Sequence, residues 1–398
     1  MKLIPVLELK DFVYASKYVY LPVLFDVTDT VLLHPEDEIS NSYRRRQKIK
    51  EYLKSRYNVD LNAKIMFDHG IFISNEKFRQ MFSTEKTAES ILKVYNVLGV
   101  DYGIAFDIPS RLHLQYSIEI AVARALHRDE NRLIRSINEK VRGEVEAVAS
   151  ILSGFLTKSD EKTMRDRLQR MLREKHARLY RSLRLLSMQT VEESLKNLKE
   201  QLEIKSKRGY KFQLIPVVQG LFEDHAKMAL REILDLLGSY GEFVVENNSQ
   251  YFYIAIGTSG TQLSESDEKM INSILVYGHE LAKKEGINIR FHLLGINSFD
   301  KIRADLVYSA DAVTVRRRAV DGKLYVIEDG KLKLIEVDKI KEWDCNCPAC
   351  NRFKELVLEK SSRRRNDVRM IHNLFVLSQF VNQKQERSQS LKKAPLLQ

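Results

Sequence analysis

The most chemically distinctive stretch of this chain is residues 344–350, Asp-Cys-Asn-Cys-Pro-Ala-Cys, which holds all three cysteines of the 398 residues. Cys345, Cys347 and Cys350 stand as C-x-C-x-x-C, and His372 follows in a segment with a helix-like apolar pattern. Thiolate and imidazole are the ligands that Zn²⁺ prefers, and four of them close a tetrahedral structural site. Random placement rarely packs every cysteine into so short a stretch. We therefore expect one structural Zn²⁺, in preference to three unrelated buried cysteines or a redox pair.

A second set of candidate residues consists of polar or glycine residues that follow strand-like apolar runs. They are Asp68, Asp107, Gln219, Gly257 and Asp311. The runs alternate with helical patterns, which indicates a parallel α/β fold. In a (β/α)₈ barrel the chemistry lies at the carboxyl ends of the strands. We therefore predict a (β/α)₈ TIM barrel, with a doubly wound sheet as the alternative that lacks its usual G-x-G-x-x-G signal.

Apolar periodicity predicts the elements that would position these side chains. Strand-like runs lie at 19–25, 65–70, 101–107, 212–220, 251–257 and 288–295, and helical patterns at 85–98, 224–237 and 266–285. A hairpin is predicted at 323–336, turning at Asp329-Gly330. The charged residues between 111 and 207 predict two long antiparallel helices with Gly154 near the bend.

These elements suggest a division of the chain into five parts. The parts are a first barrel segment (1–110), a long helical insertion (111–209), a second barrel segment (210–335), a C-terminal zinc-binding subdomain (336–382) and a flexible tail (383–398). The apolar content of 44% is enough for a sizeable core. No run of about 18 apolar residues indicates a membrane span. The first ten residues lack the layout of a secretory signal, and few cysteines fit a reducing compartment. We expect a cytoplasmic protein.

The net charge of +11 suits a polyanionic partner, most simply nucleic acid. Basic residues concentrate between 165 and 184, where only Asp166 and Glu174 are acidic. This stretch is equally consistent with a solvated coiled-coil face and with a nucleic-acid surface. The candidate phosphate contacts are Arg165, Arg170, Arg173, Arg181, Arg316 and Arg317.

The order of Asp68, Asp107, Gln219-Gly220, Asp311 and C-x-C-x-x-C…His resembles the queuine and archaeosine tRNA-guanine transglycosylase superfamily. That family has a (β/α)₈ barrel with a zinc subdomain, and it exchanges a guanine base in nucleic acid for a 7-deazaguanine. The resemblance covers most of the chain apart from the helical insertion. It implies a pentosyltransferase that binds nucleic acid, a 7-deazaguanine base and one structural Zn²⁺.

The resemblance also implies roles for individual residues. Asp311, preceded by Ala310 where the family has an aromatic residue, would be the nucleophile. Asp68 would be the acid/base. The base pocket would be lined by His69, Phe72, Asp107, Gln219, Gly220 and Gly257. His69 replaces a serine of the family, a departure that concerns which base enters.

The chemistry of base exchange independently needs two carboxyl groups. Retention of the anomeric configuration requires two displacements, so one carboxylate forms a covalent sugar–enzyme intermediate. A second carboxyl group passes a proton to the departing base and takes one from the incoming base. The base must also leave its stack to reach the pocket.

Several readings remain open from the sequence. The favoured substrate is tRNA on base rates, and DNA is the alternative, because related DNA-guanine transglycosylases use the same chemistry. A non-catalytic nucleic-acid-binding paralogue would not need both Asp68 and Asp311. An unrelated phosphate- or sugar-binding barrel would not need the zinc motif. Family barrels often dimerise near the zinc subdomain, so a homodimer is also open.

Overall fold

The computed structural model describes most, but not all, of the chain. The described residues are 1–8, 24, 28–34, 48–57, 63–68, 87–106, 143, 158–257, 265–295, 302–311, 313–359 and 364–393. The first predicted insertion helix with Gly154, and all of the predicted strand at 19–25 except Leu24, lie outside them. His69, Phe72 and Asp107 also lie outside the described residues.

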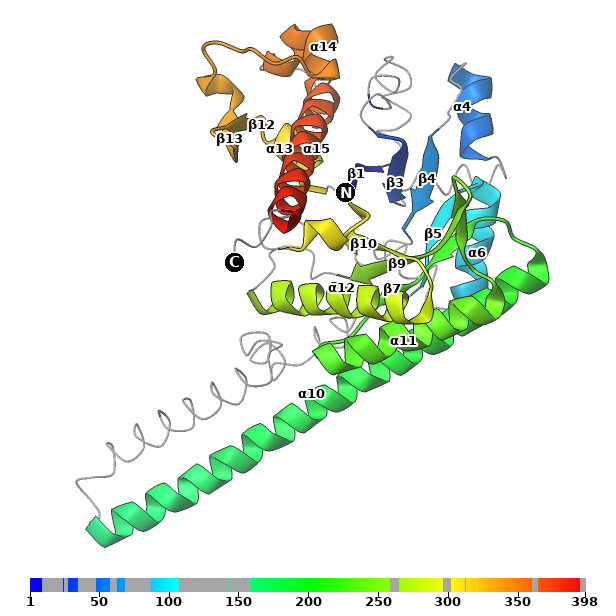
Figure 1. Cartoon of the computed structure of the whole chain (residues 1–398). Helices are drawn as coiled ribbons and strands as arrows, with labels where there is room; N and C mark the ends of the chain where they lie inside the picture. The colour runs from blue at the N-terminus through cyan, green and yellow to red at the C-terminus, as the bar shows by residue number, and fades with distance from the viewer. Residues whose placement is uncertain are drawn as a thin grey trace.

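Parallel strands form two sheets in a mixed α/β fold (Figure 1). One sheet has the order β1 (Lys2–Ile4), β11 (Ser309–Asp311), β10 (Ile289–Leu294), β9 (Ser249–Gly257) and β7 (Val217–Val218), and β8 (Val244–Glu246) pairs antiparallel with β9. The other has the order β2 (Val6–Glu8), β3 (Thr30–His34), β4 (Lys64–Phe67), β5 (Tyr102–Ile104) and β6 (Gln213–Ile215). Each neighbouring pair along these two paths is parallel.

Two prolines mark the points where the chain passes from one sheet to the other. Pro5 separates β1 from β2, and Pro216 separates β6 from β7. Proline has no N–H to donate, so it interrupts a ladder while its carbonyl still accepts. The carbonyl of Pro5 accepts from Leu32 at 3.0 Å, and that of Pro216 accepts from Ala255 at 2.8 Å. Hydrogen bonding therefore continues across both junctions.

Helices pack against the strands and share an apolar cluster with them (Figure 1). They are α4 (Ile49–Tyr57), α6 (Thr87–Leu98), α10 (Lys158–Arg208), α11 (Glu223–Tyr240), α12 (Glu265–Glu285) and α13 (Val313–Val320), with a 3₁₀ turn at Ala304–Leu306. Because strand side chains alternate between faces, β9 contributes Ile254 and Ile256 to the larger apolar cluster, shared with the helices, and Tyr253 and Ala255 to a smaller one. The smaller cluster joins both sheets; its buried members are Ile4, Leu32, Met66, Tyr102, Ile104, Ile215, Val217, Val244, Tyr251, Tyr253 and Ala255.

The helix α10 (Lys158–Arg208) confirms the second of the two long helices predicted for residues 111–207. It runs for 51 residues, about 77 Å at 1.5 Å per residue. Its C-terminal part carries buried Val191, Leu198 and Leu202 and packs against α6 and α11. Its N-terminal part projects from the body of the protein (Figure 1). The second half of this helix therefore belongs to the same apolar core as the strands.

An ionic and aromatic cluster lies near the amino ends of the strands. Glu246, at the end of β8, accepts hydrogen bonds from Lys64 at 3.1 Å, Arg290 at 2.6 Å and Tyr308 at 3.1 Å. The Arg290 guanidinium lies 3.7 Å from the ring centre of Tyr251 and 4.4 Å from that of Tyr308. Burial raises the pKa of Glu246, but its hydrogen bonds from Lys64 and Arg290 outweigh burial and hold that pKa at about 2.

We expect Glu246→Gln to lower the free energy of unfolding at neutral pH by about 1.5–3 kcal/mol, because a carboxylate bonded to charged donors is lost. The folded-state pKa lies below the ordinary value of 4.5, so this stabilisation is present above 4.5 and is lost as the pH falls toward about 2. Urea denaturation across that range should show the two proteins converging. The control is Glu328→Gln, which removes an exposed partner of Lys333 and should change little. Equal effects of both variants at neutral pH would contradict the prediction.

The C-terminal part confirms the predicted hairpin and the helix around His372. It contains β12 (Lys323–Glu328), β13 (Lys331–Glu336), a 3₁₀ turn at Val337–Lys339, α14 (Pro348–Leu358) and α15 (Arg364–Lys393). The helix continues through 383–393, where the sequence analysis predicts a flexible tail. That range has no glycine or proline, and its Gln, Lys, Glu and Arg residues favour a helix. None of the described helices is long and apolar enough to cross a membrane.

Candidate functional site

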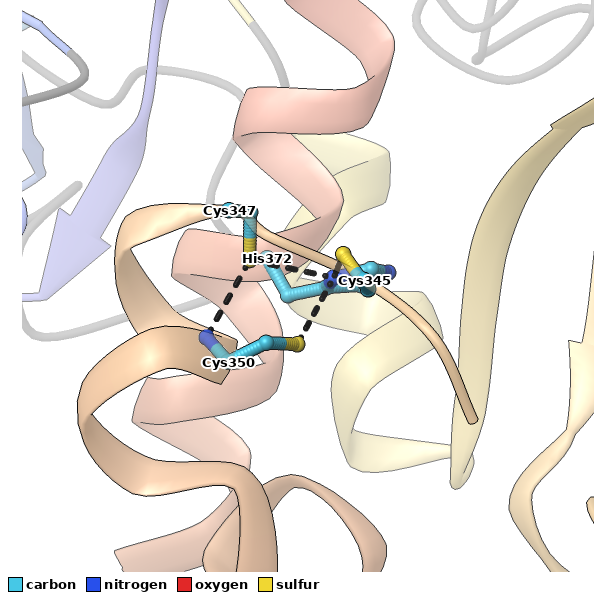
Figure 2. A group of neighbouring side chains, drawn as sticks. All are labelled: Cys345, Cys347, Cys350 and His372. Carbon is cyan, nitrogen blue, oxygen red and sulfur yellow. Dashed lines mark hydrogen bonds between the residues drawn. The ribbon is translucent and has the colours of Figure 1, made fainter. Parts of the chain in front are cut away.

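The four predicted metal ligands come together at one point (Figure 2). The ligand atoms of Cys345, Cys347, Cys350 and His372 all lie within 4.8 Å of one another. His372 Nδ1 lies 3.5, 3.4 and 3.5 Å from the three Sγ atoms in that order. Bond lengths of about 2.3 Å for Zn–S and about 2.0–2.1 Å for Zn–N place S and N about 3.5 Å apart in a tetrahedral site. The spacing of these donors therefore fits Zn²⁺.

Local sequence explains how one short segment delivers three sulfur atoms. Cys347 is the N-cap of α14, and its Sγ accepts the backbone N–H of Cys350 at 3.2 Å. Pro348 follows at the first helical position, where its missing N–H costs nothing. The helix start thus places Cys347 and Cys350 on the same side of the first turn, and Cys345 reaches them from the preceding loop.

His372 is oriented by a backbone acceptor behind it. Its Nε2 donates to the carbonyl of Tyr325 in β12 at 2.9 Å, so the lone pair of Nδ1 faces the sulfur atoms. Such partners fix the tautomer of a metal-binding imidazole. Trp343 Nε1 donates to Cys350 Sγ at 3.2 Å. The imidazole is 1% exposed, which is typical of a closed structural site.

The closely spaced thiols and imidazole shift one another's pKa values. Hydrogen bonds from Cys347 and Cys350 hold the pKa of the Cys345 thiol far below its usual value, while Cys345 raises the pKa of Cys347. Burial lowers the pKa of His372, but hydrogen bonds with Cys345 and Cys350 outweigh burial and raise it to about 9. Three thiolates at this separation repel one another unless a proton or a metal ion lies between them. These four residues can hold a metal ion, and their donor set is consistent with Zn²⁺.

The predicted carboxylates lie at the carboxyl ends of their strands. Asp311 is the last residue of β11 and is 3% exposed, and its Oδ1 accepts the backbone N–H of Gly295, just after β10. Asp68 follows β4, and its N–H donates to Leu33 at 3.2 Å. Gln219 follows β7. Within each sheet the strands are parallel, so Asp311 and Gln219 lie at the carboxyl edge of one sheet and Asp68 lies at the carboxyl edge of the other.

The two predicted pocket glycines allow close approach of neighbouring groups. A Cβ on Gly257, the last residue of β9, would lie 3.0 Å from Nε2 of Gln219. Gly220 has φ of +150°, and a Cβ there would lie 2.9 Å from the backbone N of Ala226. Glycine at 257 therefore lets the Gln219 side chain lie close to the end of β9.

Gln201 of α10 is not predicted from the sequence, and its buried side chain binds the backbone of Phe106, shortly after the end of β5. Its Oε1 accepts from the N–H of Phe106 at 2.9 Å, and its Nε2 donates to the carbonyl of Phe106 at 3.1 Å. The amide thus binds Phe106 as a neighbouring strand would. The available signal was a glutamine between Leu198 and Leu202 on an apolar helix face.

The predicted basic contacts are distributed over two helices. Arg170 and Arg181 are exposed on α10, and Arg316 and Arg317 lie on α13, which begins two residues after Asp311. The side chains of Arg165 and Arg173 lie outside the described part of the chain. Besides Asp166, which is also exposed, five exposed charged residues on the projecting part of α10 recur at spacings of three and four, which places these five on one helix face. They are Arg167, Arg170, Glu174, Arg178 and Arg181.

Comparison with known proteins shows a distant similarity. A tRNA-guanine(15) transglycosylase of Methanocaldococcus jannaschii is 28% identical over 204 residues, which cover 48% of this chain and 28% of that protein. The chain thus matches less than a third of the length of this curated relative. No protein-family model matches the chain. The similarity supports the resemblance to the transglycosylase superfamily.

Proposed function

We propose that this protein is a nucleic-acid guanine transglycosylase that exchanges guanine for a 7-deazaguanine through a covalent aspartyl–sugar intermediate, on tRNA in the first instance. The observation that carries the proposal is that Asp68 and Asp311 each follow a strand of a parallel sheet, at its carboxyl end. The similarity to a tRNA-guanine(15) transglycosylase supports it. A non-catalytic paralogue would have no use for two such carboxylates.

We also propose that the two sheets are halves of one closed (β/α)₈ barrel. The two sheets share the strand runs that Pro5 and Pro216 interrupt, so β1–β2 and β6–β7 each count as one strand. The path then has eight parallel members and returns to its start: β1–β2, β3, β4, β5, β6–β7, β9, β10 and β11. The smaller apolar cluster, with members from both sheets, would fill the barrel interior. The candidate carboxylates would then share the catalytic face.

The proposed reaction assigns one task to each carboxylate. Asp311 attacks the anomeric carbon of the target nucleotide, and the bond from that carbon to the guanine nitrogen breaks. Asp68 gives a proton to the departing guanine and then takes one from the incoming base, which displaces Asp311 from the sugar. The Gly295 N–H binds one oxygen of Asp311, which orients the carboxylate. Gln219, Gly220, Gly257 and, outside the described residues, His69, Phe72 and Asp107 would hold the base.

A bound Zn²⁺ would have a structural task in this scheme. Four protein ligands leave it no open position for substrate. It would join the loop before α14 to α15 and take no part in the chemistry.

A base-exchange assay with labelled guanine tests the proposal. Purified zinc-loaded protein is offered tRNA and duplex DNA in parallel, with Asp311→Ala as the control. We expect label to enter tRNA with the unaltered protein only. Incorporation into DNA alone would keep the reaction and change the substrate. Failure to label either nucleic acid would overturn the proposed function.

The basic face of α10 is proposed as a nucleic-acid contact. Replacing Arg170, Arg178 and Arg181 with glutamine should weaken binding and flatten its salt dependence by a slope of about 0.7–0.9 for each lost phosphate contact. Binding measured at several salt concentrations gives that slope. The control replaces three lysines of the hairpin region with glutamine, for the same change in net charge; they are Lys331, Lys333 and Lys339. Equal slopes for the two triple variants would show that this face of α10 is a solvated surface and not a phosphate contact.

A further inference from the structure

Three buried polar side chains form a hydrogen-bonded row across neighbouring strands. Tyr253 lies in β9, His292 in β10 and Ser309 in β11, and none is more than 5% exposed. The Tyr253 hydroxyl lies 2.6 Å from Ser309 Oγ, which lies 2.9 Å from His292 Nδ1. Ser309 and Asp311 share one face of β11, because strand side chains alternate. The row therefore lies one step below the proposed nucleophile.

The hydrogen bonds in this row assign the histidine tautomer. A buried phenol O–H needs an acceptor, and Ser309 Oγ is the acceptor within reach of Tyr253 among the described residues. The Ser309 hydroxyl is then left to donate to Nδ1 of His292, so the ring proton lies on Nε2. Burial lowers the pKa of His292 to about 3, against a smaller opposing effect of Asp68. The ring is therefore a neutral Nε2–H donor near neutral pH.

That donor has no acceptor among the described residues. His292 Nε2 is buried and makes no hydrogen bond there. Unpaired buried polar groups are rare, and each one calls for a functional or structural reason. Asp68 is the carboxylate whose charge acts on His292. A buried donor without an acceptor thus lies within the electrostatic reach of the proposed acid/base.

We infer that His292 is a positioning residue for Asp68, whose carboxylate accepts the Nε2–H of His292 when a base occupies the pocket. This inference rests on the proposed function. Holding one oxygen of Asp68 leaves the other to exchange the proton with the base. His292 does not pass its Nε2 proton to Asp68. Release of that proton would need a replacement proton at Nδ1, and Nδ1 already accepts the hydrogen bond from Ser309. Tyr253 and Ser309 fix the ring and its tautomer.

Nitrogen NMR of the histidine-labelled protein tests the tautomer and its acceptor. The chain has nine histidines, and the signals absent from His292→Gln identify this one. We expect a protonated Nε2 and an unprotonated Nδ1. Added 7-deazaguanine should shift the Nε2 signal in the unaltered protein and in Asp338→Ala, and leave it in place in Asp68→Ala. A proton on Nδ1, or an equal shift with and without the Asp68 carboxylate, would overturn the inference.

Kinetics of base exchange separate positioning from simple packing. His292→Phe keeps a ring without the donor and should lower kcat by about 10–100-fold, the value of a hydrogen bond to a charged group. KM for nucleic acid should stay close to that of the unaltered protein. His292→Gln carries an N–H in a similar place and should recover most of the turnover. Native zinc content and melting temperature in both variants verify folding.

The outcomes distinguish this inference from the function on which it rests. Unchanged kcat in His292→Phe, or equal losses in the Phe and Gln variants, would refute the role of His292 while exchange by the unaltered protein stands. Absence of exchange by the unaltered protein would refute the proposed function instead. The Asp68→Asn and His292→Phe losses should also fail to add in the double variant, because both remove one shared interaction.

Discussion

Replacing Asp311 with alanine is expected to abolish base exchange and the covalent protein–nucleic acid adduct together, while nucleic-acid binding persists. Only a nucleophile on the side of the sugar opposite the departing base can displace that base from the anomeric carbon. A second displacement, by the incoming base, then restores the original configuration at that carbon. Asp311 suits that role because its carboxylate is buried at a strand end and oriented by the N–H of Gly295. We expect binding to persist because the proposed phosphate contacts are basic groups other than Asp311.

The measurement is a denaturation-resistant adduct, trapped during turnover and mapped by mass spectrometry. The matched control is Asp338→Ala, an exposed aspartate in the C-terminal region, which should form the adduct at the normal rate. Asp68→Asn should lose about 10²–10⁴ in turnover, because the proton transfer to and from the base is lost. An adduct on Asp68 would reverse the two roles. Robust exchange by Asp311→Ala would overturn the mechanism.

Much of the fold follows from periodicity where elements are long. The patterns at 224–237 and 266–285 match α11 and α12, and the runs at 251–257 and 288–295 match β9 and β10. The short strands β1 and β2 were missed because Pro5 divides an apolar run of only a few residues, which reads as a loop. Thr30–His34 was also missed. Pairing across the two prolines is a property of the assembled sheets, which no local pattern contains.

The metal ligands could be predicted from the sequence, whereas the buried polar partners Gln201 and His292 could not. The four metal ligands could be predicted from the sequence, because three cysteines and a histidine in that spacing have few functions other than metal binding. The buried partners could not: Gln201 and His292 are single polar residues in apolar patterns, and their significance depends on groups that lie far away in sequence. Gln201 acts on Phe106, and His292 depends on Ser309 for its tautomer.

The metal cluster predicts the second large effect. Cys347→Ser should lose zinc and unfold the C-terminal region, because Cys347 is a predicted ligand, whereas serine can still cap α14. Structural Zn²⁺ contributes about 10–16 kcal/mol in zinc-finger peptides, and that binding energy is folding energy. The measurements are zinc content per chain and the melting temperature, with and without a chelator. Asn346→Ser changes an exposed neighbour and should keep both values, whereas full zinc content in Cys347→Ser would contradict the assignment.

Loss of zinc should also destabilise the proposed catalytic face, because α15 connects the metal cluster to it. His372 is followed by Asn373, which is fully buried and donates to the carbonyls of Val315 in α13 and Lys323 in β12. Since α13 begins two residues after Asp311, a loosened α15 removes the support behind the strand that carries the proposed nucleophile. We therefore expect Cys347→Ser to lose base exchange in step with its zinc content, and normal exchange by a zinc-free protein would show that the two sites are independent.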